Sequence, residues 1–265
     1  MKSVARRGAY LALRGSGALG LQRARRVRAG QGWATILVFH TLSLTYPHDG
    51  ITMSPKLFGD IARMLRDSYD VISLTDLVAR IRSGTGFSGR EVVITFDDGY
   101  LDNYQFAAPV LRELSLPACF YLTAGFIGTD RQFPWDTARD RRTVMMSWDQ
   151  AREMHRMGFE IGCHTWNHPD LGTEPIASAT RELGDARAKL EDETGARVTH
   201  FAYPFGGAGN IRAEWVDAIR DAGFASNGSC HGGQVHAGDD PLMLARVGCH
   251  QRTVTDVRIE IDTPW

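Results

Sequence analysis

The segment EVVITFDDGY, residues 91–100, joins an apolar run directly to two adjacent carboxylates, Asp97 and Asp98. A short run rich in Val, Ile and Phe is typical of a strand that is buried on both faces of a parallel sheet. Buried strands do not usually end in paired acids, because burial and mutual repulsion both oppose the ionisation of neighbouring carboxyl groups. The segment therefore predicts a buried strand whose carboxyl end carries functional groups.

Two interpretations of the acid pair are open from these residues alone. Adjacent acids at the end of a strand can cap the helix that follows, but Asp102 and Asn103 are also available for that purpose. Successive side chains of an extended strand diverge, so the two carboxylates can do different work. One of them can bind a metal ion while its neighbour faces a reacting atom.

The rest of the chain alternates strand-like and helix-like segments around this strand. Strands are predicted at residues 34–40, 70–74, 91–96, 118–123, 159–164, 198–204, 224–228 and 242–248, and helices at 54–69, 75–82, 103–114, 147–158, 174–195 and 213–223. Alternation of this kind favours a parallel sheet with helices outside it. We expect an α/β fold, a closed or nearly closed, distorted (β/α)7-type barrel, with a doubly wound open sheet as the alternative.

The overall composition is that of an ordinary soluble protein. The chain has 265 residues, of which 43% are hydrophobic and 23% charged, with a net charge of −1. This balance shows no nucleic-acid signature. No run approaches the roughly 18–20 apolar residues that are needed to span a bilayer. The four cysteines include no CxxC pair and are expected to be reduced, buried thiols.

The charge is distributed unevenly along the chain. Residues 1–48 hold eight basic residues and no Asp or Glu. We expect residues 1–30 to be a basic arm that is flexible and solvated or lies against a membrane surface, ahead of one folded domain at residues 31–265. The arm is a weak secretory signal, because Arg14 interrupts the apolar stretch 9–13. The lack of a clear signal favours the cytoplasm or the cytoplasmic face of the membrane.

Polar side chains collect at the predicted carboxyl ends of several strands. These residues are His40, Asp97, Asp98, His164 and the run Tyr203, Pro204 and Phe205, with Arg246 in the last strand. If the strands are parallel neighbours, all of these groups emerge on one rim, where barrel enzymes place their active sites.

His164 and His168 are four residues apart, so both imidazoles can reach one metal ion from a single turn. Two histidines and one carboxylate, with positions left open for water, make a usual catalytic zinc site. The alternative is a loop whose histidines only form hydrogen bonds. The remaining histidines, His48, His155, His200, His231 and His236, have no matched partners and are expected to be structural or exposed.

Three motifs, TFDDGY at 95–100, HTWNH at 164–168 and FAYPFG at 201–206, closely resemble those of the polysaccharide deacetylase family, also called NodB-homology or carbohydrate esterase family 4. The resemblance covers residues 34–250 and implies a NodB-like fold. It also implies that Asp98, His164 and His168 bind a divalent metal, with Zn²⁺ as the default and Co²⁺, Ni²⁺ or Fe²⁺ as alternatives. Asp97 would be the general base, and the backbone N–H of Phe205 would bind the oxyanion.

The chain departs from the commoner pattern of the family at two places. Ala202 stands where many relatives carry an arginine, and Arg246 is expected to orient Asp97 in its place. The general acid is expected to be His40, which ends LVFH as in the branch that resembles exopolysaccharide deacetylases acting on poly-N-acetylglucosamine. His250 is the alternative acid, and a capped core histidine is the structural alternative for His40.

The implied reaction is the removal of N-acetyl groups from an acetamido sugar in a polysaccharide, oligosaccharide or glycolipid. Alternatives are a related C–N hydrolase acting on a non-sugar amide or cyclic imide, and a non-catalytic carbohydrate-binding domain. Tyr203, Pro204 and Trp166 are expected to contact the sugar. Trp135 and Trp148 are weaker candidates, and packing is the alternative role for each tryptophan.

Overall fold

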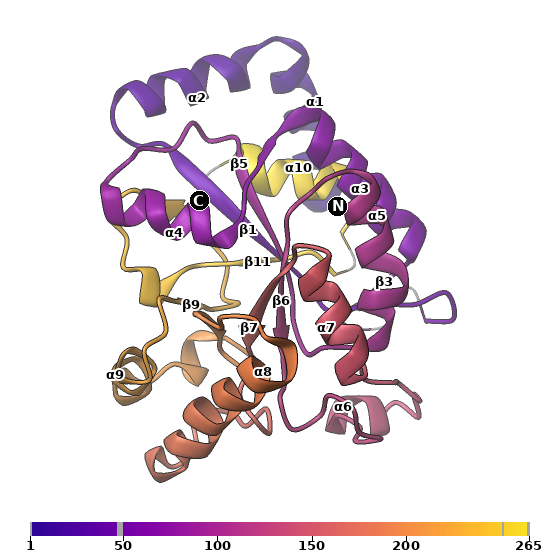
Figure 1. Ribbon diagram of the computed structural model, residues 1–265. Helices are drawn as coiled ribbons and strands as arrows, with labels where there is room; N and C mark the ends of the chain where they lie inside the picture. The colour runs from indigo at the N-terminus through magenta and orange to yellow at the C-terminus, as the bar shows by residue number, and fades with distance from the viewer. Residues whose placement is uncertain (1, 47–49, 251, 264–265) are drawn as a thin grey trace.

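The computed structural model describes residues 2–46, 50–250 and 252–263 and shows a curled, mostly parallel sheet with helices on its outside (Figure 1). The sheet has nine strands in the order β10-β1-β5-β6-β7-β8-β9, with β11 paired to β1 and β4 paired to β5. The strands are β1 (Trp33–Phe39), β4 (Asp70–Val71), β5 (Glu91–Phe96), β6 (Cys119–Leu122), β7 (Glu160–Cys163), β8 (His200–Ala202), β9 (Ser226–Gly228), β10 (Val235–His236) and β11 (Val247–Gly248). β2 (Thr41–Leu42) and β3 (Thr52–Met53) form a separate parallel pair.

The sheet curls into a nearly closed barrel. Residues 244–248 bridge the gap between its ends: Leu244 pairs with Gly228 of β9, and β11 pairs in parallel with β1. Among the described strands of the sheet, only β10 runs antiparallel to its neighbour. The predicted α/β barrel is therefore confirmed, and the doubly wound alternative is wrong because the last strand returns to the first.

Helices cover the outer face of the barrel (Figure 1). They are α3 (Pro55–Ser68), α4 (Leu74–Ser83), α5 (Ala108–Glu113), α6 (Pro134–Thr137), α7 (Trp148–Arg156), α8 (Ala186–Thr194), α9 (Ala213–Asp221) and α10 (Val254–Asp262). Local signals determine where several helices begin and end. The side chains of Ser54 and Ser147 cap α3 and α7, each accepting a hydrogen bond from the backbone N–H of the residue three positions later. Gly195 ends α8 with a φ of 70°. Residues 103–114 and 174–195 were each expected to be a single regular helix, and neither is.

Each of these two segments contains a wider, π-helical turn, the first at Asn103–Ala107 and the second at Thr180–Asp185, after a 3₁₀ turn at Ile176–Ser178. The first turn places Asn103, whose side-chain amide donates to the His40 carbonyl oxygen over 2.6 Å. The second places the buried Glu182, whose carboxylate accepts from the backbone N–H groups of Trp166 and Asn167. Both turns therefore anchor loops at the carboxyl end of the barrel, as π-helical turns often do near functional sites.

The C-terminal part of the chain differs from its predicted pattern. The strand expected at 242–248 shrinks to β11, because Pro241 begins a 3₁₀ turn that is capped by the Asp240 side chain. Helix α10 carries no prediction, yet it begins with a capping box between Thr253 and Asp256. Its Ile261 carbonyl accepts from the indole N–H of Trp33, which ties α10 to β1.

The N-terminal residues form two helices, α1 (Lys2–Gly15) and α2 (Ala18–Arg28), and not the flexible tail that their charge suggested. The physical reason is α10, whose acids pair with the basic side chains: Arg7 with Asp256 and Arg23 with Asp262. Tyr10 and Leu19 are buried against Ile259 of the same helix. Among the described residues, no helix is both long and apolar enough to cross a bilayer.

Candidate metal and hydrolytic centre

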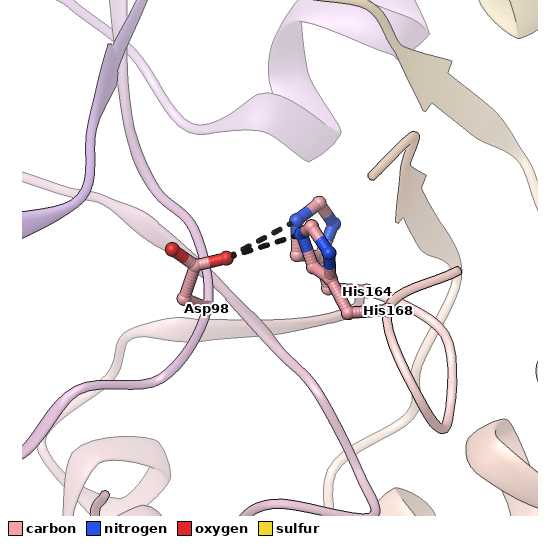
Figure 2. Close-up of side chains that lie close together, drawn as sticks. All are labelled: Asp98, His164 and His168. Atoms are coloured by element: carbon pink, nitrogen blue, oxygen red, sulfur yellow. Dashed lines mark ion pairs between the residues drawn. The ribbon is translucent and has the colours of Figure 1, made fainter. Parts of the chain in front are cut away.

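Asp98, His164 and His168 converge at the carboxyl ends of β5 and β7 (Figure 2). The Oδ1 atom of Asp98 lies 3.5 Å from Nε2 of His164 and 3.4 Å from Nε2 of His168. All three side chains are at least nine-tenths buried. They form the one group of three metal-ligating side chains found within the described part of the chain, with ligand atoms within 4.8 Å of one another.

This geometry fits a divalent cation better than it fits direct hydrogen bonding. The separations are longer than a charge-assisted hydrogen bond, whereas two ligands about 2.1 Å from a tetrahedral ion lie about 3.4 Å apart. The Nδ1 atom of His164 is 2.8 Å from the carbonyl oxygen of Ala202, so it carries the proton and leaves the Nε2 lone pair free. The Oδ2 atom of Asp98 is buried with no hydrogen-bond partner among the described residues. The three side chains are therefore suited to hold a metal ion.

The electrostatics of the cluster also favour a cation. Burial opposes ionisation of Asp98, but the close imidazoles of His164 and His168 outweigh it and lower the pKa of that carboxyl. Burial lowers the pKa of His168, which stays neutral more readily. Burial would also lower the pKa of His164, but the neighbouring Asp97 and Asp98 charges raise it. A cation in the cluster would compensate the same two negative charges.

The backbone at the site is held in an uncommon conformation. Asp98, Thr165, His168 and Phe205 all have positive φ values, of 76°, 65°, 59° and 60° respectively, although none is glycine. Such residues persist only where the surrounding structure fixes them, and they concentrate at functional sites. The loops after β5, β7 and β8 are thus shaped to aim particular side chains and amides.

Asp97 is held by a two-point contact with Arg246. Nη1 and Nη2 of the guanidinium donate to Oδ1 and Oδ2 of the carboxylate, each over 2.8 Å. Both side chains are buried, and Nε of Arg246 donates to the carbonyl oxygen of Ser229. Burial opposes ionisation of Asp97, but the Arg246 charge overcomes it and lowers the pKa. Asp97 is therefore a fixed carboxylate next to the metal-binding cluster.

The structure explains the absence of an arginine at position 202. Ala202 is fully buried, and its carbonyl oxygen is the hydrogen-bond partner of His164. The guanidinium beside Asp97 comes from residue 246, ahead of β11, and passes over Gly228 of β9. A Cβ atom at Gly228 would lie 2.7 Å from Nε of Arg246, so glycine is needed there.

His40 and His250 face the same cavity as the acids. Nε2 of His40 lies 4.0 Å from Oδ2 of Asp97, and the two imidazole rings are 6.2 Å apart. Burial and the neighbouring His40 lower the pKa of His250. Neither histidine belongs to the metal-binding cluster, so each is free of that task.

A cavity of about 370 Å³ joins these groups. Its lining includes His40, Asp97, Asp98, Trp135, Arg139, His164, His168, Tyr203, Phe205, Cys230 and His250. The size is within the usual range for small-molecule sites, about 300–1,000 Å³. The Phe205 side chain is 52% exposed at the cavity, and its backbone N–H makes no hydrogen bond to any described residue. That amide is available to a bound oxygen atom.

Two of the residues expected to contact the sugar do not line the cavity. Trp166 packs instead under the guanidinium of Arg181, 4.5 Å from its ring centre. Pro204 also lies outside the lining, and its carbonyl accepts from the Gly206 N–H. The aromatic wall is Trp135, whose ring lies 5.0 Å from that of His168. Its indole N–H donates to the hydroxyl of Tyr100.

Arg139 and Cys230 line the cavity although no sequence motif marked them, and Trp135, a weaker candidate for sugar contact, lines it as well. Trp135 and Arg139 belong to the long connection 124–146, and long connections in compact domains are often functional. All four cysteines are free thiols; Cys119, Cys163 and Cys249 are buried as expected, whereas Cys230 is half-buried. His200 is structural, since its ring bonds to Thr75 and Ser226. His48 lies outside the described residues.

The cavity combines an Asp–His–His cluster with a separately held carboxylate, at the carboxyl end of a nearly closed β/α barrel. This arrangement is typical of a hydrolase active site. The family model described as polysaccharide deacetylase matches residues 85–226, which include the metal-binding cluster and Asp97. The match covers more than half of the chain. The chain therefore belongs to the polysaccharide deacetylase family, a class of amide-cleaving hydrolases.

Two curated relatives support this assignment. The Bacillus subtilis protein YxkH, named as a polysaccharide deacetylase, is 26% identical over 190 residues, which is 71% of this chain and 61% of that protein. The poly-β-1,6-N-acetyl-D-glucosamine N-deacetylase of Escherichia coli K12 is 29% identical over 109 residues, which is 40% of this chain and 16% of that protein. The chain thus spans less than two thirds of either relative.

Solved structures share the fold. The Streptococcus pyogenes deacetylase PplD, in complex with acetate, superposes with a TM-score of 0.73 at 19% identity, over 86% of this chain and 98% of that one. IcaB from Ammonifex degensii gives a TM-score of 0.72 at 22% identity, over 88% and 98%. These likenesses establish the NodB-like architecture.

Proposed function

We propose that this protein is a metal-dependent N-deacetylase that hydrolyses the acetamide of an N-acetylated sugar in a carbohydrate polymer, oligomer or glycolipid. The observation that carries the proposal is the joint placement, in one cavity, of the Asp98–His164–His168 cluster and the Asp97–Arg246 pair. A related protein is named for deacetylation of poly-β-1,6-N-acetyl-D-glucosamine, which makes that polymer the first substrate to examine.

Asp98, His164 and His168 would hold the metal ion, with Zn²⁺ as the default for two imidazoles and a carboxylate and Co²⁺, Ni²⁺ or Fe²⁺ as alternatives. A divalent ion supplies a Lewis acid that polarises the acetyl carbonyl and makes water more acidic. His164 is oriented for this by its bond to Ala202, and His168 by the loop that Glu182 anchors.

Asp97 acts as the general base in this proposal. Arg246 holds both of its oxygens, so the carboxylate keeps one orientation and stays ionised until it takes the proton of the attacking water. The N–H of Phe205 donates to the oxygen that becomes negative as the carbonyl carbon turns tetrahedral. Each task falls to a group whose position the surrounding backbone fixes.

His40 acts as the general acid that protonates the departing amine nitrogen. It lies on the Asp97 side of the cavity, with its Nε2 atom 4.0 Å from Oδ2 of that carboxylate, and it is not part of the metal-binding cluster. His250 is the alternative acid, since its ring lines the same cavity, but its lowered pKa leaves less of it protonated at neutral pH.

Tyr203 and Trp135 would form the sugar-binding walls, since both line the cavity and Trp135 offers an aromatic face. The intact set of metal-binding residues and base argues against a non-catalytic carbohydrate-binding role. A location in the cytoplasm or at the cytoplasmic face of a membrane stays a prediction.

Acetate release tests the proposal. The metal-loaded protein is incubated with poly-β-1,6-N-acetylglucosamine, N-acetylglucosamine oligomers of other linkage, and simple amides and cyclic imides. We expect acetate from at least one acetamido sugar, with loss of activity on chelation and its return with Zn²⁺ or Co²⁺. Hydrolysis of only the non-sugar amides or imides would assign the related C–N hydrolase activity instead, and no hydrolysis by the metal-loaded protein would contradict the proposal.

A further inference from the structure

The N-terminal helix α1 turns its charged side inward and an uncharged side outward. Arg6 and Arg7 face α10, where they pair with Glu260 and Asp256. The outward positions are Gly8, Ala9, Leu11, Ala12 and Leu13, all of which are exposed. The exposed fractions of Leu11 and Leu13 are 57% and 46%. A surface helix of a soluble domain usually has the opposite arrangement, with its apolar side against the core.

Helix α2 continues this surface with a mixture of apolar and basic groups. Leu21 is 56% exposed, and its exposed neighbours on the same side include Arg25 and Arg28. Residues 1–48 contain no Asp or Glu that could neutralise these arginines. Exposed leucines beside uncompensated arginines are the combination found on helices that lie in a membrane interface. Figure 1 shows both helices at the outer edge of the molecule.

A second, independent feature lies at the turn between the two helices. A cavity of about 270 Å³ is lined by four arginines, Arg14, Arg23, Arg90 and Arg258, and by one acid, Asp262. That acid is already engaged by Arg23 and by the hydroxyls of Tyr10 and Tyr69. The lining therefore carries a net excess of positive charge in a concave space.

The same cavity receives the start of α2. Gly17 and Gly20 line it, and Gly17 at the N-cap position offers no side-chain cap to the first amides of the helix. Uncapped N–H groups at a helix start favour an anion, as do guanidinium groups, which bind phosphate oxygens in pairs. The cavity is thus chemically suited to a phosphate group.

We propose that α1 and α2 form a docking surface for an anionic phospholipid bilayer, with a lipid phosphate in the arginine-lined cavity and the exposed leucines at the boundary of the acyl chains. The leucines adjoin the cavity in the chain, since Leu13 precedes Arg14 and Leu21 follows Gly20. Nucleic acid would use the arginines but not the leucines. A second copy of the chain that docked through this same surface would present the same positive charge and be repelled.

This surface and the catalytic cavity lie at opposite ends of the barrel. Helix α2 leads into the start of β1, whereas His40 follows its last residue, and the seven residues of β1 span about 23 Å. Docking through α1 and α2 would therefore leave the catalytic cavity open away from the lipid. In this orientation the catalytic cavity can reach carbohydrate that extends from the membrane, but not the lipid headgroups.

Vesicle co-sedimentation with the full chain tests the proposal. The probes are phosphatidylcholine vesicles with and without about 30% phosphatidylglycerol, in about 0.1 M and about 0.5 M salt. We expect at least about tenfold stronger binding to the anionic vesicles, weakened by salt, because charge and apolar contact both contribute. Comparable binding to both kinds of vesicle would contradict the proposal.

Two sets of variants separate the contributions. Leu11→Ser/Leu21→Ser and Arg14→Gln/Arg25→Gln/Arg28→Gln should each lower binding to anionic vesicles several-fold. The matched controls change exposed residues elsewhere and should leave binding to anionic vesicles unchanged. They are Leu44→Ser/Ile176→Ser and Arg112→Gln/Arg156→Gln/Arg197→Gln. If both N-terminal variants bind as the unchanged protein does, the surface is wrongly assigned.

Other occupants give distinct results. Strong binding of duplex RNA or DNA without vesicle binding, or a dimer in light scattering that Leu11→Ser/Leu21→Ser disperses, would overturn the proposal. So would binding of inorganic phosphate alone, with no association with anionic vesicles. Because these residues lie far from the catalytic cavity, the variants should keep the acetate release of the unchanged protein. Failure of the vesicle-binding experiment can therefore be distinguished from failure of the proposed deacetylase activity.

Discussion

Arg246 and Asp97, 149 residues apart in the chain, form a buried two-point contact. The Nη1 and Nη2 atoms of Arg246 lie 2.8 Å from the Oδ1 and Oδ2 atoms of Asp97, respectively. The contact supplies at residue 246 the arginine that is missing at residue 202. It fixes the carboxylate that we assign as the base, while the neighbouring Asp98 turns to the two histidines. Adjacent acids in the sequence thus have separate partners and separate tasks.

Replacing Arg246 by Lys tests the two-point contact. Lysine keeps the charge but cannot donate to both oxygens in a fixed plane, so kcat should fall at least about tenfold with a smaller change in KM. The free energy of unfolding should fall by about 1–3 kcal/mol, because buried hydrogen-bond partners lose their donor. Steady-state kinetics and urea unfolding measure the two effects. Arg112→Lys, an exposed control, should change neither, and unchanged kcat in Arg246→Lys would show that the contact does not orient the base.

His40 and His250 can be ranked by mutation. His40→Ala should lower kcat by about 10²–10⁴, the usual contribution of a general acid, while His250→Ala should lower it far less. Acetate release under saturating substrate gives the comparison, with bound metal measured in each variant to show that the cluster is intact. The opposite order would move the acid to His250.

Glu182 positions the metal-binding loop without touching the substrate. Its carboxylate accepts from the amides of Trp166 and Asn167 and from the Asn167 side chain, next to His168. Glu182→Ala should weaken metal binding by about 10–100-fold, the usual effect of losing a group that orients a ligand. Metal titration of the chelated protein measures it. Glu113→Ala, on an exposed position, is the control, and equal metal affinity in Glu182→Ala would assign that residue to packing alone.

The docking of α1 predicts a pH-dependent stability. The hydrogen bond from Arg7 lowers the pKa of Asp256 to about 2 from 3.8. Because the pKa is lower in the folded state, the stabilisation is fully present above about pH 4 and is lost as the pH falls toward 2. Both side chains are partly exposed, so solvent screening should keep the effect small. The free energies of unfolding of Arg7→Gln and the unchanged protein, measured in urea, should differ at pH 6 and converge near pH 2. A difference that stays constant with pH would show that the Arg7–Asp256 pair does not cause the pH-dependent stability.

The sequence predicted much of the barrel because its strands are short apolar runs separated by helices with clear ends. Asp97, Asp98, His164 and His168 could be found because adjacent acids and a four-residue histidine spacing are local signals. Trp166 shares that local signal, yet its loop turns the ring toward Arg181. Trp135 enters the cavity through stacking on Phe133 and a bond to Tyr100, contacts that no short segment reveals.

The N-terminal helices illustrate the same limit. Residues 1–30 contain no strong local signal for docking, and their charge alone suggested a solvated arm. Their order depends on Asp256 and Asp262, which lie more than 200 residues further along. Long-range ion pairs of this kind become visible only when the fold brings α10 beside α1.

The most direct test of the division between Asp97 and Asp98 measures metal content and acetate release together in three proteins. The unchanged protein should hold one divalent ion per chain and release acetate. Asp98→Ala should lose both the ion and the activity. Asp97→Asn should keep the ion at the unchanged stoichiometry while kcat falls by at least about 10²-fold, because only the base is lost. Near-full acetate release by metal-loaded Asp97→Asn, or loss of its metal, would contradict the assignment of the two acids.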